Sequence, residues 1–446
     1  MKITRMLSAL LLIIYFGQNA KAQINTKVYF GYQNKIPVWL AENNVPCVGI
    51  GIIENGKIKF VKVFGELQKN VPAPVNTIFN IASQTKPVVA LLTLKLVESG
   101  QWNLDEPLYK YWIDPDVISD TLHKILTTRH VLSHQTGFLN WRINHPTKKL
   151  TFDFEPGTKF QYSGEGFEYL RKALENKFKK PLEKLLDSLV FQPLGMKDTR
   201  YWSKDLDTTR FARWHDANGK RYAMSDRTAV SAADDLLTTI EDYCKFGIDV
   251  MNGAGLSAAL FNDMVSPQVE VKKHCYRGLG WGLVKDLPNG EYALEHGGSD
   301  IGVRTMAVFL PKSKRGIVVM TNGDNGMNVF INVIKESIDI GNDILDYIYK
   351  SPSVHKIITL PAEIIENYVG TYIQPNGRLM TITKEDNAIK MSGDGMPTFV
   401  LYPETETRFC LKDFDAQLEF IKDETGRVIK LVTYENGKKG MEAQKR

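Results

Sequence analysis

The order of the secondary-structure signals along the 446-residue chain is the feature that most constrains its fold. Segment 46–65 holds two β-rich runs around Asn55-Gly56, a dipeptide typical of a hairpin because both residues tolerate positive φ. Largely helical sequence with long loops covers 105–260. Beyond it the apolar period changes to two, which predicts consecutive antiparallel strands, and one further helix is expected near 329–349. We therefore expect an α+β fold whose antiparallel sheet is built from both ends of the region, with a helical insertion between.

The C-terminal part of the chain has a different pattern. A linker is predicted at 351–360, and six short β-rich segments follow at about ten-residue spacing. This spacing is typical of a small all-β meander or barrel. The sequence thus predicts a main domain at 23–350 and a C-terminal β-barrel-like domain at 361–446.

Residues 1–22 have the features of a secretory signal peptide. Lys2 and Arg5 precede the apolar run Met6–Phe16, and small residues follow. The run is too short to span a bilayer comfortably, because a spanning helix needs about 20 apolar residues. We expect cleavage before Gln23, a secreted or periplasmic protein and no transmembrane anchor after cleavage; the alternative is an uncleaved anchor.

Composition excludes several other functions. The apolar fraction is 43% and the charged fraction 24%, which is ordinary for a globular protein. The net charge is +5 and falls to +2 without the three basic residues of the signal segment, and no basic stripe suggests a nucleic-acid partner. The four cysteines lie far apart and fit neither a disulfide scaffold nor a zinc pattern, so isolated buried thiols are favoured.

No motif for a cofactor is present, since the chain has neither a Walker A loop nor a G-x-G-x-x-G sequence after a strand. His130 and His134 stand four residues apart on a predicted helix, but no further ligand accompanies them. A packed, hydrogen-bonded His134 at the "HQTG" turn is favoured over a metal ligand. We expect neither a metal nor a cofactor.

The segment "FNIASQTKPVVALLTLKLVESG" contains Ser83 and Lys86, which share one face of a helix. Pro87 is tolerated only near a first helical turn, which places Ser83 at the helix N-terminus. There the helix dipole and free N–H groups stabilise a developing anion. The alternative is an ordinary N-cap serine with a solvated lysine. A second Ser-x-x-Lys match, Ser353/Lys356, lies in the predicted linker and is interpreted as chance.

Four further segments accompany this motif in chain order: "LSHQTGF" (Leu132–Phe138), "FEPGTKFQYSGEGFEYL" (Phe154–Leu170), "FQPLGMKDT" (Phe191–Thr199) and "EHGGSDIG" (Glu295–Gly302). Together they resemble the motifs of the serine β-lactamase and penicillin-binding protein superfamily, in its class C-like branch. That branch includes D-alanyl-D-alanine carboxypeptidases, D-aminopeptidases and esterases. The resemblance covers about residues 35–345 and implies a β-lactamase/transpeptidase-like fold. The C-terminal part resembles a small lipocalin-like domain, for which a structural role is favoured.

The resemblance implies that Ser83 is an acylated nucleophile and that Lys86 and Tyr162 share the general-base and proton-shuttle work. A serine hydroxyl needs such a base, and burial can make a lysine able to act as one near neutral pH. Which of the two is the resting base stays open. His296 would add a positive or hydrogen-bonding group facing the tyrosine.

The resemblance also implies an oxyanion hole made by the backbone N–H groups of Ser83 and Ser299. Gly297 and Gly298 would let substrate lie close to the strand edge. Two residues depart from the family pattern. Gly164 stands where an amide-binding Asn is usual, and His296 stands where classical lactamases have Lys.

The expected function is therefore an exported serine hydrolase that forms an acyl-enzyme with amides or esters, D-amino-acid peptides being favoured. A β-lactamase or a small-ester esterase of the same fold is the alternative. A non-catalytic penicillin-binding or sensor protein is the alternative from another class. The expected partner is a small peptide, ester or β-lactam.

Overall fold

A computed structural model describes residues 31–68, 70–223, 229–350, 355–411, 416–435 and 437–446. The predicted signal peptide and its cleavage site lie outside the described residues. Within the described ranges, no helix combines the length and the apolar character that crossing a bilayer requires.

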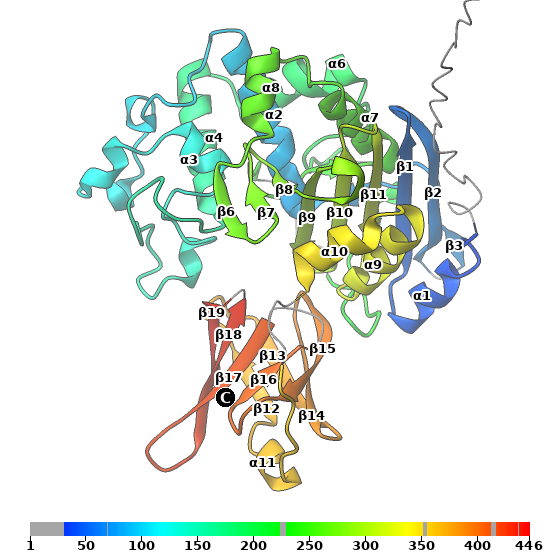
Figure 1. The fold of residues 1–446 in the computed structure, drawn as a ribbon, viewed down its shortest axis with the longest axis vertical. Helices are drawn as coiled ribbons and strands as arrows, with labels where there is room; N and C mark the ends of the chain where they lie inside the picture. Colours follow the sequence, from blue (N-terminus) through cyan, green and yellow to red (C-terminus); the bar gives the residue numbers. More distant parts are fainter. Residues whose placement is uncertain (1–30, 69, 224–228, 351–354, 412–415, 436) are drawn as a thin grey trace, which may run out of the picture.

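The main domain is built on a nine-stranded antiparallel sheet (Figure 1). The N-terminal hairpin consists of β1 (Cys47–Glu54) and β2 (Lys57–Gln68), joined at Asn55-Gly56, where both residues have positive φ. β1 pairs with β11 (Arg315–Thr321), so the start of the domain joins strands from its end. This confirms the predicted sheet. The order is β3-β2-β1-β11-β10-β9-β8-β7-β6, in which the other strands are β3 (Val71–Pro72), β6 (Val269–Lys272), β7 (Cys275–Arg277), β8 (Gly282–Val284), β9 (Ala293–Asp300) and β10 (Val303–Leu310).

Helices cover both faces of this sheet. Each face of the sheet packs against its own hydrophobic core, and adjacent residues of β10 point into different cores. Phe309 belongs to the core formed with α2 (Thr85–Glu98) and α7 (Ile240–Met251). Val308 belongs to the core formed with α1 (Ile36–Glu42) and with the helices that follow β11. The prediction of a single helix near 329–349 is wrong. Two helices are present, α9 (Gly326–Ser337) and α10 (Gly341–Tyr349), because the backbone becomes extended at Ile338.

The helical insertion contains more loop than the sequence predicted. Its helices are α3 (Thr128–Leu132), α4 (Gly164–Phe178), α5 (Leu182–Leu186), α6 (Gln192–Leu194), α7 and α8 (Ala258–Met264), and a π-helical turn follows α5 at Asp187–Phe191. Helices α4 and α7 agree with the largely helical sequence of this region. Helix α3 ends at Leu132, before the "HQTG" turn where His134 has φ 57°, so His134 does not lie on the helix that was predicted to carry it with His130. A two-stranded sheet, β4 (Phe79–Asn80) with β5 (Leu237–Thr238), joins this region to the segment before α2.

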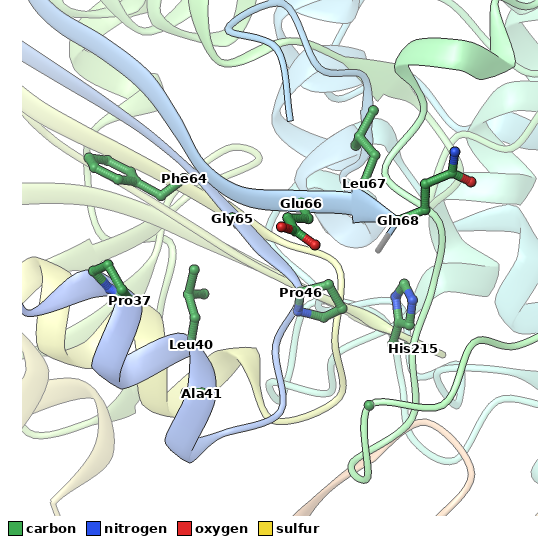
Figure 2. Close-up of a pocket in the computed structure, with 11 residues that line it drawn as sticks. Pro37, Leu40, Ala41, Pro46, Phe64, Gly65, Glu66, Leu67, Gln68 and His215 are labelled. Carbon is green, nitrogen blue, oxygen red and sulfur yellow. The ribbon is translucent and has the colours of Figure 1, made fainter. Parts of the chain in front are cut away.

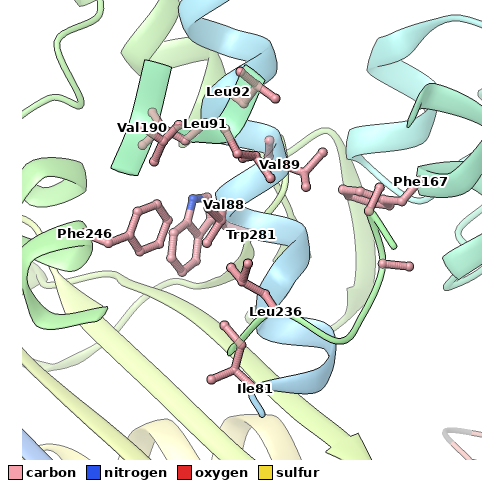
Figure 3. Packing of buried hydrophobic residues seen from close by; sticks show 14 of the residues in the cluster. Ile81, Val88, Val89, Leu91, Leu92, Phe167, Val190, Leu236, Phe246 and Trp281 are labelled. Atoms are coloured by element: carbon pink, nitrogen blue, oxygen red, sulfur yellow. The ribbon is translucent and has the colours of Figure 1, made fainter. Parts of the chain in front are cut away.

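Helix α2 is buried around almost its whole circumference. Figure 3 shows its apolar residues surrounded by side chains from several elements, among them Phe167, Val190, Leu236, Phe246 and Trp281. Burying one such side chain contributes roughly 1.5–3 kcal/mol. The helix ends at Ser99, and Gly100 follows with φ 71°, the left-handed conformation of a C′ glycine. This packing fixes the position of the helix N-terminus.

The C-terminal domain is a closed eight-stranded barrel, preceded by α11 (Ala362–Glu366). Six of its strands match the predicted segments: β13 (Leu379–Glu385), β14 (Ala388–Gly393), β15 (Met396–Pro403), β16 (Arg408–Cys410), β17 (Ala416–Lys422) and β18 (Val428–Glu435). Two strands escaped prediction, β12 (Gly370–Ile373) and β19 (Lys438–Lys445), and their pairing closes the barrel. Both parts of the predicted fold class are confirmed. All four cysteines are free thiols, three buried and Cys275 partly buried.

Candidate active site

Ser83 and Lys86 are in direct contact. Lys86 Nζ donates a hydrogen bond to Ser83 Oγ at 2.9 Å and another to the carbonyl of Ala233 at 2.8 Å. The Lys86 side chain is fully buried within the α2 core, which excludes the alternative of a solvated lysine. The amine and the hydroxyl are therefore placed for proton exchange, as the i, i+3 spacing predicted.

The turn that presents Ser83 is held in an uncommon backbone conformation. Ser83 lies in a 3₁₀ turn, Ala82–Gln84, immediately before α2. Ala82 has φ 46°, and its N–H donates to Asn80 Oδ1 at 2.7 Å. Positive φ at a residue with a Cβ costs energy and persists only where surrounding contacts determine it. Here the hydrogen bond from Ala82 to Asn80 holds the residue that directly precedes Ser83.

Tyr162 brings a third segment to the same place. Its ring centroid lies 4.8 Å from Lys86 Nζ. On the other side, the Tyr162 ring stacks on His134 with centroids 4.3 Å apart, and His134 Nδ1 accepts a hydrogen bond from the N–H of Ser163 at 3.1 Å. Burial holds the pKa of His134 well below its ordinary value, and the charges of Arg277 and Lys86 lower it further. The expectation of a packed, hydrogen-bonded His134 is confirmed, and its ring positions Tyr162.

His296 lies on β9, with its ring centroid 6.4 Å from that of Tyr162. Burial, then the charges of Arg277 and Lys86, hold the pKa of His296 well below its ordinary value. The imidazole is thus neutral near pH 7, which favours a hydrogen-bonding over a positive group. Nδ1 lies 2.7 Å from the carbonyl of Gly297, so Nδ1 carries the proton because a carbonyl only accepts. Nε2 is then a bare acceptor, buried and without a partner among the described residues.

Strand β9 is held tightly against the turn that carries Ser83. Gln84 Nε2 donates to the His296 carbonyl at 3.0 Å, and Thr305 Oγ1 donates to the Ile81 carbonyl at 3.2 Å. A Cβ on Gly298 would lie 2.2 Å from that Ile81 oxygen, so only glycine permits this approach. This close approach explains why residue 298, the second glycine of the "HGG" motif, has no side chain.

The edge of β9 beside Ser83 is available to a ligand. The pairing of β8 with β9 covers Ala293–Glu295 and stops before His296. Gly297 is partly exposed and Ser299 is exposed. An extended substrate can pair with such a strand edge through its main chain.

Gly164 is enclosed by neighbouring residues. Its N–H donates to Asn140 Oδ1 at 2.9 Å, and a Cβ at this position would lie 2.7 Å from the Trp141 ring. A side chain at residue 164 therefore has no room, and the indole of Trp141 occupies the space beside it. The departure from the family pattern at Gly164 is coupled to Trp141, a residue that the sequence analysis did not select.

Two charged residues of the site were also missed. Arg277 on β7 places its guanidinium carbon 5.9 Å from the Tyr162 ring centroid and its Nη1 3.5 Å from Glu295 Oε1. Its buried Nε has no partner among the described residues. Asp234 follows the Lys86-binding Ala233; burial raises the pKa of its carboxyl well above the ordinary value, and neighbouring Asp300 raises it further. A lone Arg in "CYRGLG" and an Asp-Asp pair carry no recognisable sequence signal.

A second concavity lies elsewhere, between α1 and the end of β2 (Figure 2). Leu40, Phe64, Glu66 and His215 are among the residues that line it. It shares no residue with the Ser83 site. The strand β2 that lines it is next to one edge strand of the sheet, β3, whereas β8 and β9 lie toward the other edge. We therefore place the candidate active site at Ser83.

Comparison with known proteins identifies the family of the chain. Residues 33–333 match the family model "Beta-lactamase", and residues 355–445 match a "Domain of unknown function (DUF3471)". Penicillin-binding protein 4* of Bacillus subtilis (strain 168) is 21% identical over 421 residues, which is 86% of this chain and 92% of that protein.

Two solved structures share the fold. One is an octameric penicillin-binding protein homologue from Pyrococcus abyssi (TM-score 0.60, 19% identity, covering 94% of this chain and 99% of that one). The other is the D-alanine carboxypeptidase AmpC from Burkholderia cenocepacia (TM-score 0.59, 18% identity, covering 70% and 98%). With the family model covering most of the chain and the Ser83–Lys86 contact in its main domain, this protein belongs to the beta-lactamase family of serine hydrolases.

Proposed function

We propose that this protein is an exported serine hydrolase that acts through an acyl-enzyme on Ser83, with D-amino-acid peptides as the favoured substrates. The observation that carries the proposal is the convergence on one amine. Lys86 Nζ lies 2.9 Å from Ser83 Oγ and 4.8 Å from the centre of the Tyr162 ring. A hydroxyl, an amine and a phenol from two separate segments thus meet in one site.

The proposed reaction has two halves. Lys86 or Tyr162 takes the proton of Ser83 Oγ as the oxygen attacks the substrate carbonyl, and the shuttled proton passes to the leaving amine or alcohol. The N–H groups of Ser83 and Ser299 stabilise the tetrahedral oxyanion. Water then attacks the acyl-enzyme and gives a proton to the same base, and the base returns that proton to Ser83 Oγ as the acyl–oxygen bond breaks, which releases the acid and regenerates the serine hydroxyl.

Neutral His296 has a defined part in this scheme. Its bare Nε2 accepts a hydrogen bond, which suits the Tyr162 hydroxyl or a donor on the substrate. An additional cation is not required of it, because Arg277 already supplies positive charge beside the site. Gly297 and Gly298 leave the strand edge open to a peptide main chain.

Arg277 supports peptides with a free carboxylate. Its guanidinium stands beside Tyr162 with one buried N–H unpaired, and a substrate carboxylate is the natural partner of such a group. The fold shared with a D-alanine carboxypeptidase agrees with this substrate class.

Hydrolysis of small esters is the second candidate, and Gly164 favours it. With Trp141 beside Gly164, the wall of the site presents an indole in place of the side-chain amide that would bind an acylamide group. Esters and short acyl groups do not require that amide. The same feature argues against an efficient β-lactamase.

Covalent labelling tests the proposal. The wild-type protein and Ser83→Ala are incubated with a fluorescent penicillin and with a fluorophosphonate, and the intact mass is measured. Labelling of the wild type that disappears in Ser83→Ala supports the acyl-enzyme. Equal labelling of both proteins refutes the nucleophile, and an unlabelled wild type refutes the acyl-enzyme. A wild type that is labelled on Ser83 but turns over no substrate favours the non-catalytic penicillin-binding alternative.

A parallel substrate panel ranks the classes. Turnover of D-Ala-p-nitroanilide, D-Ala-D-Ala peptides, p-nitrophenyl esters and nitrocefin is measured under one condition. Faster cleavage of the D-peptides than of the esters supports the favoured class. The reverse order selects the ester candidate, and rapid nitrocefin turnover overturns both.

Export is part of the proposal and has its own test. N-terminal sequencing of the protein recovered outside the cytoplasm should begin at Gln23. A chain that starts at Met1 would contradict cleavage. The division into a hydrolase domain at 23–350 and a barrel at 361–446 is proposed with it.

A further inference from the structure

The barrel contacts the main domain at the turn that ends β9. The turn between β14 and β15 carries Gly395, whose carbonyl accepts a hydrogen bond from Arg304 Nη2 at 2.7 Å. The N–H of Gly395 donates to the Tyr222 hydroxyl at 3.2 Å. A Cβ on Gly395 would lie 2.8 Å from Ile301 Cγ1 and 3.2 Å from Ile301 Cα, so the two turns are in close contact. In Figure 1 the ends of β13 and β15 point toward the sheet domain at this place.

The β9–β10 turn is otherwise held by two buried side chains. Arg304 Nη1 donates to the carbonyls of Asp300 and Val303, both at 2.6 Å. Asp324 accepts from the N–H of Gly302 at 2.7 Å and from the Tyr222 hydroxyl at 2.7 Å. The side chains of Arg304 and Asp324 are 5% and 0% exposed. The Gly395 carbonyl therefore completes a buried network rather than forming a loose surface contact.

A second barrel residue acts on the same turn. Arg378, just before β13, pairs with Asp300 at 3.2 Å. The carboxylates of Asp300, Asp234 and Asp235 lie within 4.8 Å of one another, so a cation here offsets repulsion between like charges. Asp235 accepts from Asn80 Nδ2 at 3.2 Å, and the oxygen of the same Asn80 amide holds the N–H before Ser83. The barrel is thus connected by contacts to both sides of the site.

We propose that the C-terminal barrel positions the oxyanion hole, with Arg378 and the Gly395 turn holding the end of β9 so that the Ser299 N–H stays aligned with Ser83. Ser299 directly precedes Asp300, so the backbone that Arg378 and Arg304 fix is the backbone that carries this donor. The inference rests on the proposed function. It gives an active role to a domain whose family has no described one.

The physical reason is the strictness of oxyanion geometry. Such donors must lie about 2.7–3.1 Å from the developing charge, and loss of one donor lowers kcat roughly 10²–10³-fold. Loosening the strand by removing a contact costs less than removing the donor. We expect about a tenfold loss of kcat with KM little changed, because the oxyanion exists only after attack.

The test compares two barrel arginines in the full-length protein. Arg378→Ala removes the ion pair to Asp300, whereas Arg408→Ala removes a pair of the same 3.2 Å length, to Glu419, within the barrel; the arginine side chains are 36% and 37% exposed. We measure kcat and KM for a p-nitrophenyl ester and the inhibition constant of a phenylboronic acid, whose tetrahedral adduct occupies the oxyanion hole. Arg378→Ala should lower kcat and weaken the boronate in parallel, and Arg408→Ala should match wild type.

A second variant leaves the charge of the protein unchanged, so it separates the position of the turn from the loss of a positive charge. Gly395→Ala places a methyl group against Ile301 at a residue with φ 70°, and it should produce the same loss of kcat. Wild-type kcat and boronate binding in both Arg378→Ala and Gly395→Ala would overturn the inference. Failure of the proposed function itself gives a different result, since the wild type would then show neither Ser83 labelling nor turnover.

Discussion

The two sides of the candidate site are built in different ways. On the helix side, Ser83 and Lys86 stand three residues apart, and their contact is internal to one segment that the core encloses. On the strand side, β9 is held by residues far away in sequence: Gln84 donates to the His296 carbonyl, and Gly395 of the barrel accepts from Arg304 at the turn that ends the strand. Local sequence spacing therefore determines the contact between Ser83 and Lys86, whereas contacts between distant parts of the fold determine the alignment of the oxyanion donors.

The sharpest test of the helix side is Lys86→Met, which keeps the volume of the buried side chain but removes the amine. If the amine acts as a base, acylation should fall at least about 10²-fold. The melting temperature should change little, because methionine is similar in volume to the buried lysine side chain and keeps its apolar contacts. The rate of labelling by a fluorophosphonate and a thermal melt measure both.

Lys95→Met is the matched control on the same helix, since Lys95 Nζ donates to the Ala254 carbonyl at 3.0 Å, away from Ser83. It should label at the wild-type rate. A near-normal rate in Lys86→Met would remove this amine from the mechanism and leave the tyrosine as the base.

The segment that carries Tyr162 connects the two sides, and Gly164→Asn tests its packing. A Cβ at residue 164 meets the Trp141 ring at 2.7 Å, so the variant should lose about 1–3 kcal/mol of unfolding free energy by overpacking. Urea denaturation measures the loss. Adding Trp141→Ala should recover part of it. An undiminished stability in Gly164→Asn would show that the Trp141 ring moves aside easily.

The strand side should show itself in the pH dependence of stability. The folded-state pKa of His296 is depressed, so the folded protein stays neutral there while the unfolded chain binds a proton below about pH 6.5. Its stabilising contribution is therefore complete above that pH and is lost as pH falls toward the folded pKa.

Between pH 7 and pH 5 this loss amounts to at most about 2 kcal/mol, since each pH unit corresponds to about 1.36 kcal/mol. His296→Asn should consequently show a shallower decline in its urea midpoint than wild type over this range. Equal slopes would mean that His296 titrates alike in the folded and unfolded states.

A further effect on the strand side concerns the choice of substrate. Arg277→Gln removes the guanidinium near Tyr162, and a charge-assisted hydrogen bond contributes roughly 1.5–3 kcal/mol. The value of kcat/KM should fall about tenfold or more for peptides that end in a free carboxylate and change little for neutral esters. Equal losses for both substrates would make Arg277 a structural residue.

The difference between the two sides also explains what the sequence could predict. The Ser83–Lys86 contact follows from helical periodicity and from Pro87, so it could be predicted from residues alone. Tyr162 and His296 needed the family resemblance, because no local rule brings their segments together. Arg277, Trp141 and Asp234 were missed, since their place in the site depends on strand pairing and loop packing.

The elements of the fold also differ in how far the sequence could predict them. The hairpin at Asn55-Gly56, the sheet built from both ends and six barrel strands have local signals. Strand β19, "KKGMEAQK", lacks regular apolar alternation, so only its pairing with β18 and β12 defines it. The break between α9 and α10 also carries no proline, and tertiary packing decides it.

The central claim is that a hydroxyl at the entrance of a buried helix is activated by groups from two segments and captures a carbonyl. A crystal structure of the protein after reaction with a fluorophosphonate tests it most directly. The account predicts phosphorus bonded to Ser83 Oγ, with the phosphonyl oxygen within hydrogen-bond distance of the N–H groups of Ser83 and Ser299. Phosphorus on any other side chain, or a phosphonyl oxygen that points away from β9, would contradict it.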